Sequence, residues 1–336
     1  MRPTRRGYGL LAVTVVAIAL GAQFGARSLD ALVVPAIAAL AVAAVQVYRR
    51  SEPSVVRSRP VPGFPGEERT VTLTVKSDLS CDVRERVGPG LRAPDADAEL
   101  PGGTEYEYDV ELLERGERTL GPATVSQRDT LGLVAHATES ARTTPVLVYP
   151  EVRPIADRTA FSGLVERAGS SDRDAFDRLR EYSSSDSLRD INWKASARRA
   201  DEEFVVTEFA AEDEGGITIA CEAEAGYADE MASAAASVAT YLLHADLVVD
   251  VAAPGGTTEE GRGDEQRDEV LQLLARTDAG EVADVHREAA DVHVVAGPDG
   301  TTVEVNGVDH SFDDLVDAER ESVGLGYTPR PAEVVA

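Results

Sequence analysis

The side chains most able to do chemistry are concentrated between residues 180 and 198. This stretch contains the only tryptophan, and it alternates cationic, anionic, aromatic and hydroxyl groups with almost no spacer. Such a set could bind an anionic ligand or a partner protein, and a lysine with a depressed pKa could act as a nucleophile or base. Nothing in the sequence demonstrates a depressed pKa, so we expect binding and assign no catalytic residue. The candidate site residues are Arg180, Glu181, Tyr182, Asp186, Arg189, Trp193, Lys194, Ser196 and Arg198.

The same stretch predicts one or two turns of helix. Ser187 followed by Asp190 fits a capping box, which satisfies free N–H groups at a helix start. The apolar residues that follow recur at helical spacing and predict one buried face. The simplest interpretation is a buried Trp193 surrounded by ion pairs. A recognition surface for a partner or an anionic ligand is the alternative, and a catalytic Lys194 is a third.

The stretch also resembles the signature of the domain-of-unknown-function 58 family. The matching residues are Arg180-Glu181-Tyr182, Asp186, Leu188-Arg189, Ile191, Trp193-Lys194, Ser196-Ala197-Arg198, Phe204-Val205-Val206 and Glu208-Phe209. Three positions depart from the pattern: Ser185 stands where glycine is usual, Asn192 where histidine is usual, and Thr207 where arginine is usual. The missing histidine weakens any case for proton transfer. The resemblance implies a membrane-anchored protein, similar in its C-terminal part to a von Willebrand factor type A domain, that works with a MoxR-type AAA+ ATPase.

The composition argues against one class of function. The formal net charge is −27, from 60 acidic and 33 basic residues, and such an excess repels nucleic-acid phosphates. We therefore expect no nucleic-acid partner. The near absence of lysine resembles proteins from the high-salt cytoplasm of halophilic archaea, where salt screens repulsion between acidic groups. Cys81 and Cys221 fall in different predicted domains, so we expect no disulfide and a reducing compartment.

Residues 1–50 predict a two-helix transmembrane anchor. The uncharged apolar runs Tyr8–Phe24 and Ala31–Tyr48 each have about the length that crosses a bilayer. Arginines flank both outer ends, and the positive-inside rule then places both termini in the cytoplasm, with two spans in the cell membrane. The alternative is a cleaved signal peptide, with Leu20-Gly21-Ala22 as the cleavage site.

Residues 51–66 carry four prolines and predict a linker, and residues 67–150 predict an antiparallel β-sandwich. Short runs of alternating apolar and polar residues, separated by glycine and proline turns, favour strands. We expect this domain to be a spacer and docking surface beside the membrane. The predicted strands are Thr70–Lys76, Cys81–Val87, Tyr106–Leu112, Arg118–Val125, Gly132–Ala137 and Pro145–Tyr149.

Residues 151–212 predict an irregular connection followed by the signature segment, and residues 213–322 predict an α/β domain of von Willebrand type A-like, Rossmann-type layout. Strands and helices alternate there, which indicates a mainly parallel sheet covered by helices. Residues 323–336 predict a disordered tail. The predicted elements are the strands Ile217–Cys221, Leu247–Ala253, Asp291–Ala296 and Thr301–Val305, and the helices Asp229–His244, Asp268–Arg276 and Ser311–Glu321.

The loop after the first strand of this domain decides whether a metal is expected. Type A domains that bind Mg²⁺ carry D-x-S-x-S here, because a hard cation prefers oxygen ligands. This chain reads Cys221-Glu222-Ala223-Glu224-Ala225, with a thiol and two methyl groups at the ligand positions. Glu222 and Glu224 could touch a cation weakly, but we predict no metal site. No phosphate-binding G-x-x-x-x-G-K-[ST] loop occurs, and we predict no cofactor.

The sequence therefore predicts a membrane-anchored, cytoplasm-facing interaction or scaffold protein that is not an enzyme. Its partners are the lipid bilayer, a MoxR-type AAA+ ATPase by resemblance, and other membrane or type A domain proteins. Two alternatives stay open. One is an enzyme that uses Lys194, Asp186 and Arg189 around an anionic substrate, and the other is a cation-dependent binding module.

Overall fold

The computed structural model describes residues 1–24, 27–167, 179–181, 205–207 and 216–316. The chain divides into two compact units, residues 1–149 and 150–336. The first contains two helices and two β-sheets, and the second contains a mixed sheet with helices.

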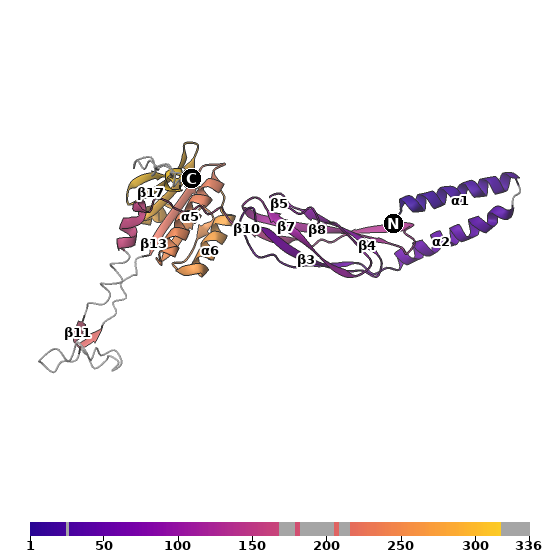
Figure 1. The fold of residues 1–336 in the computed structure, drawn as a ribbon, viewed down its shortest axis with the longest axis horizontal. Coiled ribbons are helices and arrows are strands. Elements are labelled where there is room, and N and C mark those ends of the chain that lie inside the picture. Colours follow the sequence, from indigo (N-terminus) through magenta and orange to yellow (C-terminus); the bar gives the residue numbers. More distant parts are fainter. Residues whose placement is uncertain (25–26, 168–178, 182–204, 208–215, 317–336) are drawn as a thin grey trace, which may run out of the picture. The chain divides into compact units, whose positions relative to one another are not determined.

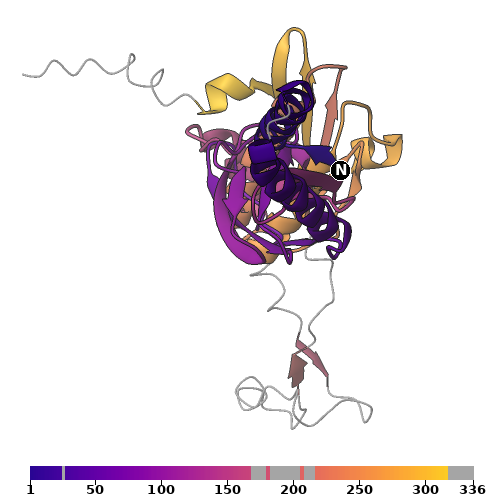
Figure 2. The same ribbon diagram turned by 90° about the vertical axis from the view of Figure 1, so that its right-hand side faces the viewer.

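The first unit begins with a helical hairpin. Helix α1 spans Arg5–Phe24, a short 3₁₀ turn spans Arg27–Leu29, and helix α2 spans Asp30–Tyr48. Both helices are long and apolar enough to cross a membrane. They lie side by side and run antiparallel (Figures 1 and 2). Their apolar side chains face outward, and Val15 and Val34 are 60% and 65% exposed. An apolar surface of this extent is stable only against lipid or another apolar surface.

The residues before α1 fold onto the sandwich. Strand β1 (Arg2–Pro3) pairs antiparallel with β9 (Val134–Glu139), with Arg2 opposite Ala135. The Thr4 hydroxyl donates to the Gly132 carbonyl at 2.5 Å and accepts from the Gly7 N–H at 3.1 Å. Thr4 therefore caps α1 and joins its start to the sandwich at the same time.

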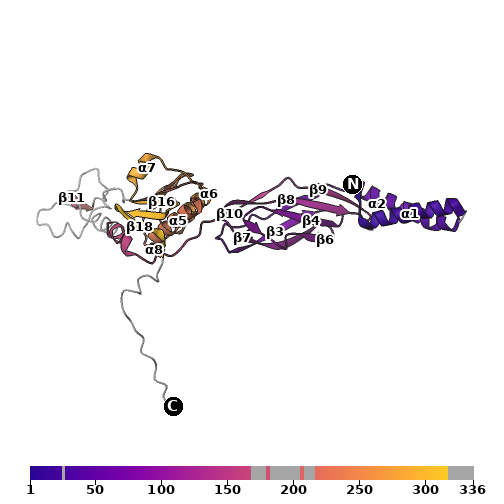
Figure 3. The ribbon, with the colours of Figure 1, turned by 90° about the horizontal axis from the view of Figure 1, so that it is seen from above.

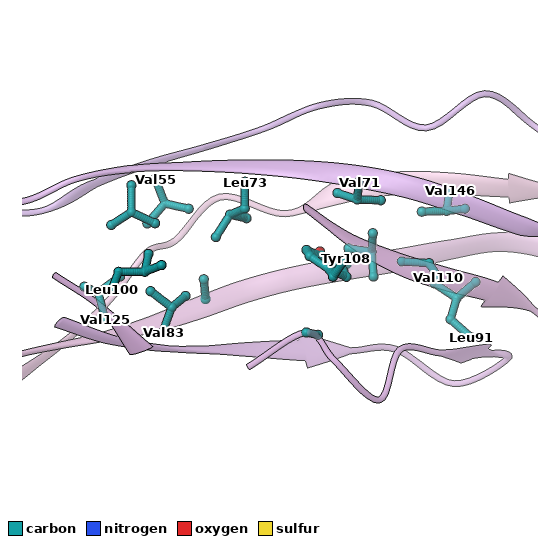
Figure 4. Packing of buried hydrophobic residues seen from close by; sticks show 14 of the residues in the cluster. Val55, Val71, Leu73, Val83, Leu91, Leu100, Tyr108, Val110, Val125 and Val146 are labelled. Atoms are coloured by element: carbon teal, nitrogen blue, oxygen red, sulfur yellow. The ribbon is translucent and has the colours of Figure 1, made fainter. Parts of the chain in front are cut away.

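Two antiparallel sheets form the sandwich. One has the order β1-β9-β8-β4-β6, with β10 also paired to β8, and the other has the order β2-β3-β7-β5. Inward-facing residues of both sheets form one apolar core that includes Val71, Leu73, Val83 and Val125 (Figure 4). The six predicted strands are confirmed, with small changes at their ends. The remaining strands are β2 Ser54–Arg57, β3 Glu68–Lys76, β4 Cys81–Val87, β5 Leu91–Arg92, β6 Ala98–Leu100, β7 Thr104–Leu112, β8 Gly116–Arg128 and β10 Thr144–Val148.

The expected linker over residues 51–66 is wrong in part, because it contains strand β2. Val55 of β2 pairs with Val75 of β3 and is buried, and Gly63 forms a further bridge with Val148. Arg57, the last residue of β2, reaches into the sandwich and pairs with Glu85 of β4 at 2.7 Å. The segment is therefore part of the sandwich core.

A six-stranded sheet forms the centre of the second unit, in the order β15-β14-β13-β16-β17-β18. Strand β13 is parallel to both β14 and β16, and the other neighbouring pairs are antiparallel. Figure 3 shows helices α5 and α6 beside this sheet. The elements are β13 Ile217–Ala223, α5 Ala228–His244, β14 Val249–Ala253, β15 Gly256–Thr257, α6 Gly263–Arg276, α7 Asp284–Ala289, β16 Val292–Gly297, β17 Gly300–Val305, β18 Val308–Ser311 and α8 Phe312–Val316.

Helix α5 owes its central position to its small side chains. Alanines 232, 234, 235, 236 and 239 are all buried, so the helix packs closely on the sheet and on α6. Two predicted helices differ from the structure. Helix α6 starts at Gly263, five residues before the predicted start at Asp268. The prediction missed the first turns because they are polar and lack the apolar periodicity of a buried helix face. The predicted helix Ser311–Glu321 begins at Phe312, since Ser311 ends strand β18.

Candidate functional site

The signature segment is described only at its two ends. Arg180 and Glu181 lie in strand β11 (Leu179–Glu181), which pairs antiparallel with strand β12 (Val205–Thr207). Leu179 stands opposite Thr207, so the start and the end of the signature lie beside each other. The other candidate residues, together with the predicted tail over 323–336, lie outside the described residues; the candidates concerned are Tyr182, Asp186, Arg189, Trp193, Lys194, Ser196 and Arg198.

The carboxyl ends of β13 and β16 form the place where an α/β sheet usually holds a ligand. From β13 the chain continues to β14 on one side, and from β16 it continues to β17 on the other. This reversal is a topological switch point, the place where open α/β sheets commonly bind ligands. Residues 221–225, which the sequence placed in a loop, lie there; Cys221, Glu222 and Ala223 are the last residues of β13, and the loop begins only after them.

In this structure an ion pair between the protein's own side chains lies at the end of β13. One carboxylate oxygen of Glu222 accepts from the Val282 N–H at 2.8 Å and from Arg287 Nη2 at 2.6 Å. The other oxygen lies 3.2 Å from His293 Nε2. Burial alone would raise the pKa of Glu222, but the hydrogen bonds from Arg287 and Val282 and the positive charge of Arg287 outweigh it and hold the pKa below its usual range. Glu222 is therefore a charged and fully engaged carboxylate.

Cys221 also lacks the properties of a metal ligand. Its side chain is buried, and its Sγ lies 3.5 Å from the carbonyl oxygen of Ala252. Burial raises the pKa of the thiol to about 12, with the charge of Glu222 adding to the effect, so the thiol stays protonated. Within the part of the chain that the structure describes, no group of three or more His, Cys, Asp or Glu side chains could hold a metal ion. The chemistry of this loop does not fit a hard divalent cation.

A second concave surface lies between residues 152–158 and helix α5. This surface, the α5 groove, has a volume of about 510 Å³. Two contacts of Arg153 hold the segment 152–158 in place. Its backbone N–H donates to Ser237 Oγ of α5 at 2.9 Å, and its Nη1 pairs with Asp313 at 3.1 Å. The lining residues are Val152, Arg153, Pro154, Ile155, Arg158, Ser237, Thr240, Tyr241, His244 and Ala245.

The α5 groove is lined by two arginines and a histidine in an otherwise acidic protein. None of the described residues that line it is acidic, whereas the chain as a whole carries 60 acidic and 33 basic residues. Arg158 is exposed, and the described residues offer its side chain no hydrogen-bond or ion-pair partner. His244 ends α5, and the ring of Tyr241 packs against Phe161 with centroids 5.3 Å apart. The groove therefore presents a guanidinium, an imidazole and a phenol that could receive a carboxylate.

Sequence reasoning missed this groove. One signal was present, because Ser237, Thr240, Tyr241 and His244 recur at helical spacing in the second half of α5, where the other residues are apolar. The arginines come from a segment about 80 residues earlier, which no local pattern connects to α5.

The chain shows only slight structural similarity to known proteins. No family model matches the chain, and no curated protein matches it. Among solved structures, the chain is similar to WR4, an MSP family member of C. elegans, at 12% identity and a TM-score of 0.22, over 28% of this chain and 94% of that one. It is also similar to the SrpA adhesin of Streptococcus sanguinis, at 12% identity and a TM-score of 0.21, over 40% and 83% of the two chains. Likenesses this slight carry no argument about function.

Proposed function

We propose that the chain is a membrane-anchored, cytoplasm-facing interaction protein without catalytic activity. The observation that carries the proposal is the pairing of β1 with β9 ahead of the apolar hairpin. Because β1 precedes α1 and belongs to a sheet of the sandwich, the chain's start and the sandwich lie on the same side of any membrane that the hairpin crosses. This arrangement requires two spans, and it argues against removal of the first helix as a signal peptide.

The arginines suggest which side this is. Arg2, Arg5 and Arg6 lie at the start of α1, and Arg49 and Arg50 follow α2. Both ends of the hairpin therefore carry positive charge on the side of the sandwich. Under the positive-inside rule, that side is the cytoplasm.

The soluble part favours binding over catalysis. At the switch point Glu222 pairs with Arg287, so the carboxylate that chemistry there would need is already engaged. The α5 groove instead offers Arg158, Tyr241 and His244 beside a rigid helix. We propose that it receives an acidic segment of a partner protein, because opposite charges attract across such a surface.

The resemblance in the signature segment extends the proposal. The parallel order β14-β13-β16 with two covering helices is compatible with a von Willebrand type A-like domain. On this basis we propose membership of the domain-of-unknown-function 58 family and a MoxR-type AAA+ ATPase as the partner.

The test is binding of the full chain, reconstituted in bilayers, to a purified MoxR-type ATPase from the same source. Charge reversal in Arg158→Glu should weaken binding at least tenfold, since a charge-assisted hydrogen bond contributes roughly 1.5–3 kcal/mol. Arg267→Glu, on α6 outside the groove, reverses a charge that is paired, among the described residues, only with Asp264 and serves as the control; it should change binding little. Equal binding by both variants would contradict the proposed surface, and a turnover measured with the wild-type chain would contradict the non-catalytic role.

A further inference from the structure

A groove lies where helix α2 ends and meets the turn between β3 and β4. Its walls come from the last turns of α2 and from Asp78 and Leu79, and its volume is about 490 Å³. We call it the interfacial groove. Its lining residues are Ala41, Val42, Val45, Gln46, Arg49, Arg50, Asp78 and Leu79.

The deeper part of the interfacial groove is apolar and open. Val42 and Val45 are 57% and 54% exposed, although they lie on a helix that also packs against α1. Ala41 lies eight residues before Arg49, which at 1.5 Å per residue places it about 12 Å deeper along the helix axis. A chain of methylene groups fits such a wall, whereas a polar ligand does not.

The rim of the groove is cationic. Arg49 is exposed, and the described residues give it no ion-pair partner. Arg50 donates from Nη1 to the Val47 carbonyl at 3.0 Å, but its Nε is buried and has no hydrogen-bond partner among the described residues. Asp78 also borders the rim, and its carboxylate accepts a hydrogen bond from the Ser51 hydroxyl. Two guanidinium groups against one carboxylate leave the rim positive.

The combination points to one class of ligand. An anionic phospholipid carries a phosphate at the level of the headgroups and an acyl chain that extends from it into the hydrocarbon. We propose that the interfacial groove binds one such lipid, with its phosphate on Arg49 and Arg50 and its acyl chain along Val42 and Val45. The lipid would fill the space between α2 and the Leu79 turn and so brace the anchor against the sandwich. This inference rests on the membrane anchor proposed above.

The test uses the full chain in nanodiscs of phosphatidylcholine mixed with phosphatidylglycerol, followed by native mass spectrometry of the released protein. The wild type should retain one phosphatidylglycerol in preference to phosphatidylcholine. Because each basic residue near the surface favours anionic lipid by a factor of about five, Arg49→Gln/Arg50→Gln should reduce the preference by roughly 10- to 30-fold. Arg84→Gln, which removes an exposed charge on β4 away from the groove, should leave it unchanged.

Further arms separate the causes. Arg49→Gln alone changes an exposed side chain, so it should keep the fold and still lower the preference several-fold. Excess inorganic phosphate should not displace the lipid; displacement would show a site for free phosphate. Equal retention of both lipids, or the same preference in Arg49→Gln/Arg50→Gln as in the wild type, would overturn the lipid site. A chain that fails to enter nanodiscs at all would instead contradict the membrane anchor.

Discussion

Replacing Arg57 by methionine should destabilise the sandwich more than any surface change. The guanidinium of Arg57 donates to both oxygens of Glu85, at 2.7 and 2.9 Å, and to Thr144 Oγ1 at 3.1 Å. The side chains of Arg57 and Glu85 are 3% and 0% exposed. Arg57→Met leaves the carboxylate of Glu85 buried without a cation. Breaking a buried pair on one side costs about 3–5 kcal/mol, because the remaining charge is neither solvated nor paired.

Two buried cysteines allow the effect to be measured in each unit separately. Cys81 lies in the sandwich core and Cys221 in the α/β sheet, and both thiols are free and buried. Labelling by a maleimide then requires opening of the surrounding structure, so its rate reports local stability. A loss of 3–5 kcal/mol should accelerate labelling of Cys81 in Arg57→Met by roughly 150- to 4,000-fold. Labelling of Cys221 should not change.

A second substitution and a surface control make the prediction refutable. Arg57→Met/Glu85→Gln removes both charges and should recover most of the loss, because neutral side chains avoid the desolvation cost. Arg92→Met breaks a pair with Glu111 whose side chains are 64% and 27% exposed, and it should accelerate labelling of Cys81 less than about fivefold. The predicted stabilisation by the buried pair is wrong if Arg57→Met accelerates labelling of Cys81 no more than Arg92→Met does. It is also wrong if the double variant is no more stable than Arg57→Met.

The same pair gives a pH dependence with a defined sign. Burial raises the pKa of Glu85 above its usual value, and Arg57 opposes the shift. Without Arg57 the pKa should rise further. A carboxyl group whose pKa is raised on folding contributes stability that is present below its unfolded pKa of about 4.3 and is lost as the pH rises through its folded pKa. The urea midpoint of Arg57→Met should therefore approach that of the wild type towards pH 4 and fall furthest behind at neutral pH.

Two more predictions concern the hairpin and the switch point. A Cβ at Gly7 would lie 2.1 Å from the Leu133 carbonyl oxygen, whereas a Cβ at Gly9 meets nothing within 4 Å. Gly7→Leu should therefore speed amide hydrogen exchange in β9 at least tenfold, and Gly9→Leu should not. Equal exchange rates in the two variants would contradict the docking of α1 on the sandwich. Arg287→Met should lower the melting temperature of the α/β unit at neutral pH. Because Arg287 holds the pKa of Glu222 below its usual range, the stability that the pair contributes is present above about pH 4.3 and is lost as the pH falls through the folded pKa of Glu222. The melting temperatures of the wild type and Arg287→Met should therefore converge on acidification. A difference that stays constant with pH would refute this role of the pair.

Local patterns predicted much of the fold. Strand β4 occupies the predicted residues 81–87, where Cys81 and Val83 alternate with charged residues and indicate the strand. Strand β2 escaped prediction, since its four residues lie between prolines and give too little alternation to detect. Arg57 shows a second limit. An arginine is normally solvent-exposed, whereas this side chain is buried because Glu85, 28 residues later, pairs with it.

The candidate sites could be predicted less well, because they depend on contacts between distant segments. Glu222 pairs with Arg287 across 65 residues, and no local pattern in the sequence connects the two. The α5 groove likewise joins Arg158 to Tyr241. The signature segment, which carried the sequence-based site, lies largely outside the described residues, and its role stays a prediction.

The proposed topology has the hairpin crossing the membrane twice, with the chain's start, the sandwich and the α/β domain on the cytoplasmic side. Single added cysteines can be labelled with a membrane-impermeant maleimide in intact and in permeabilised cells. Ser28, between the two helices, and Ser54, at the start of β2, are both exposed. We expect Ser28→Cys to be labelled in intact cells and Ser54→Cys only after permeabilisation, with the wild type and its buried cysteines as background. Labelling of both positions from the same side would contradict this topology, and so would labelling of Ser54→Cys in intact cells.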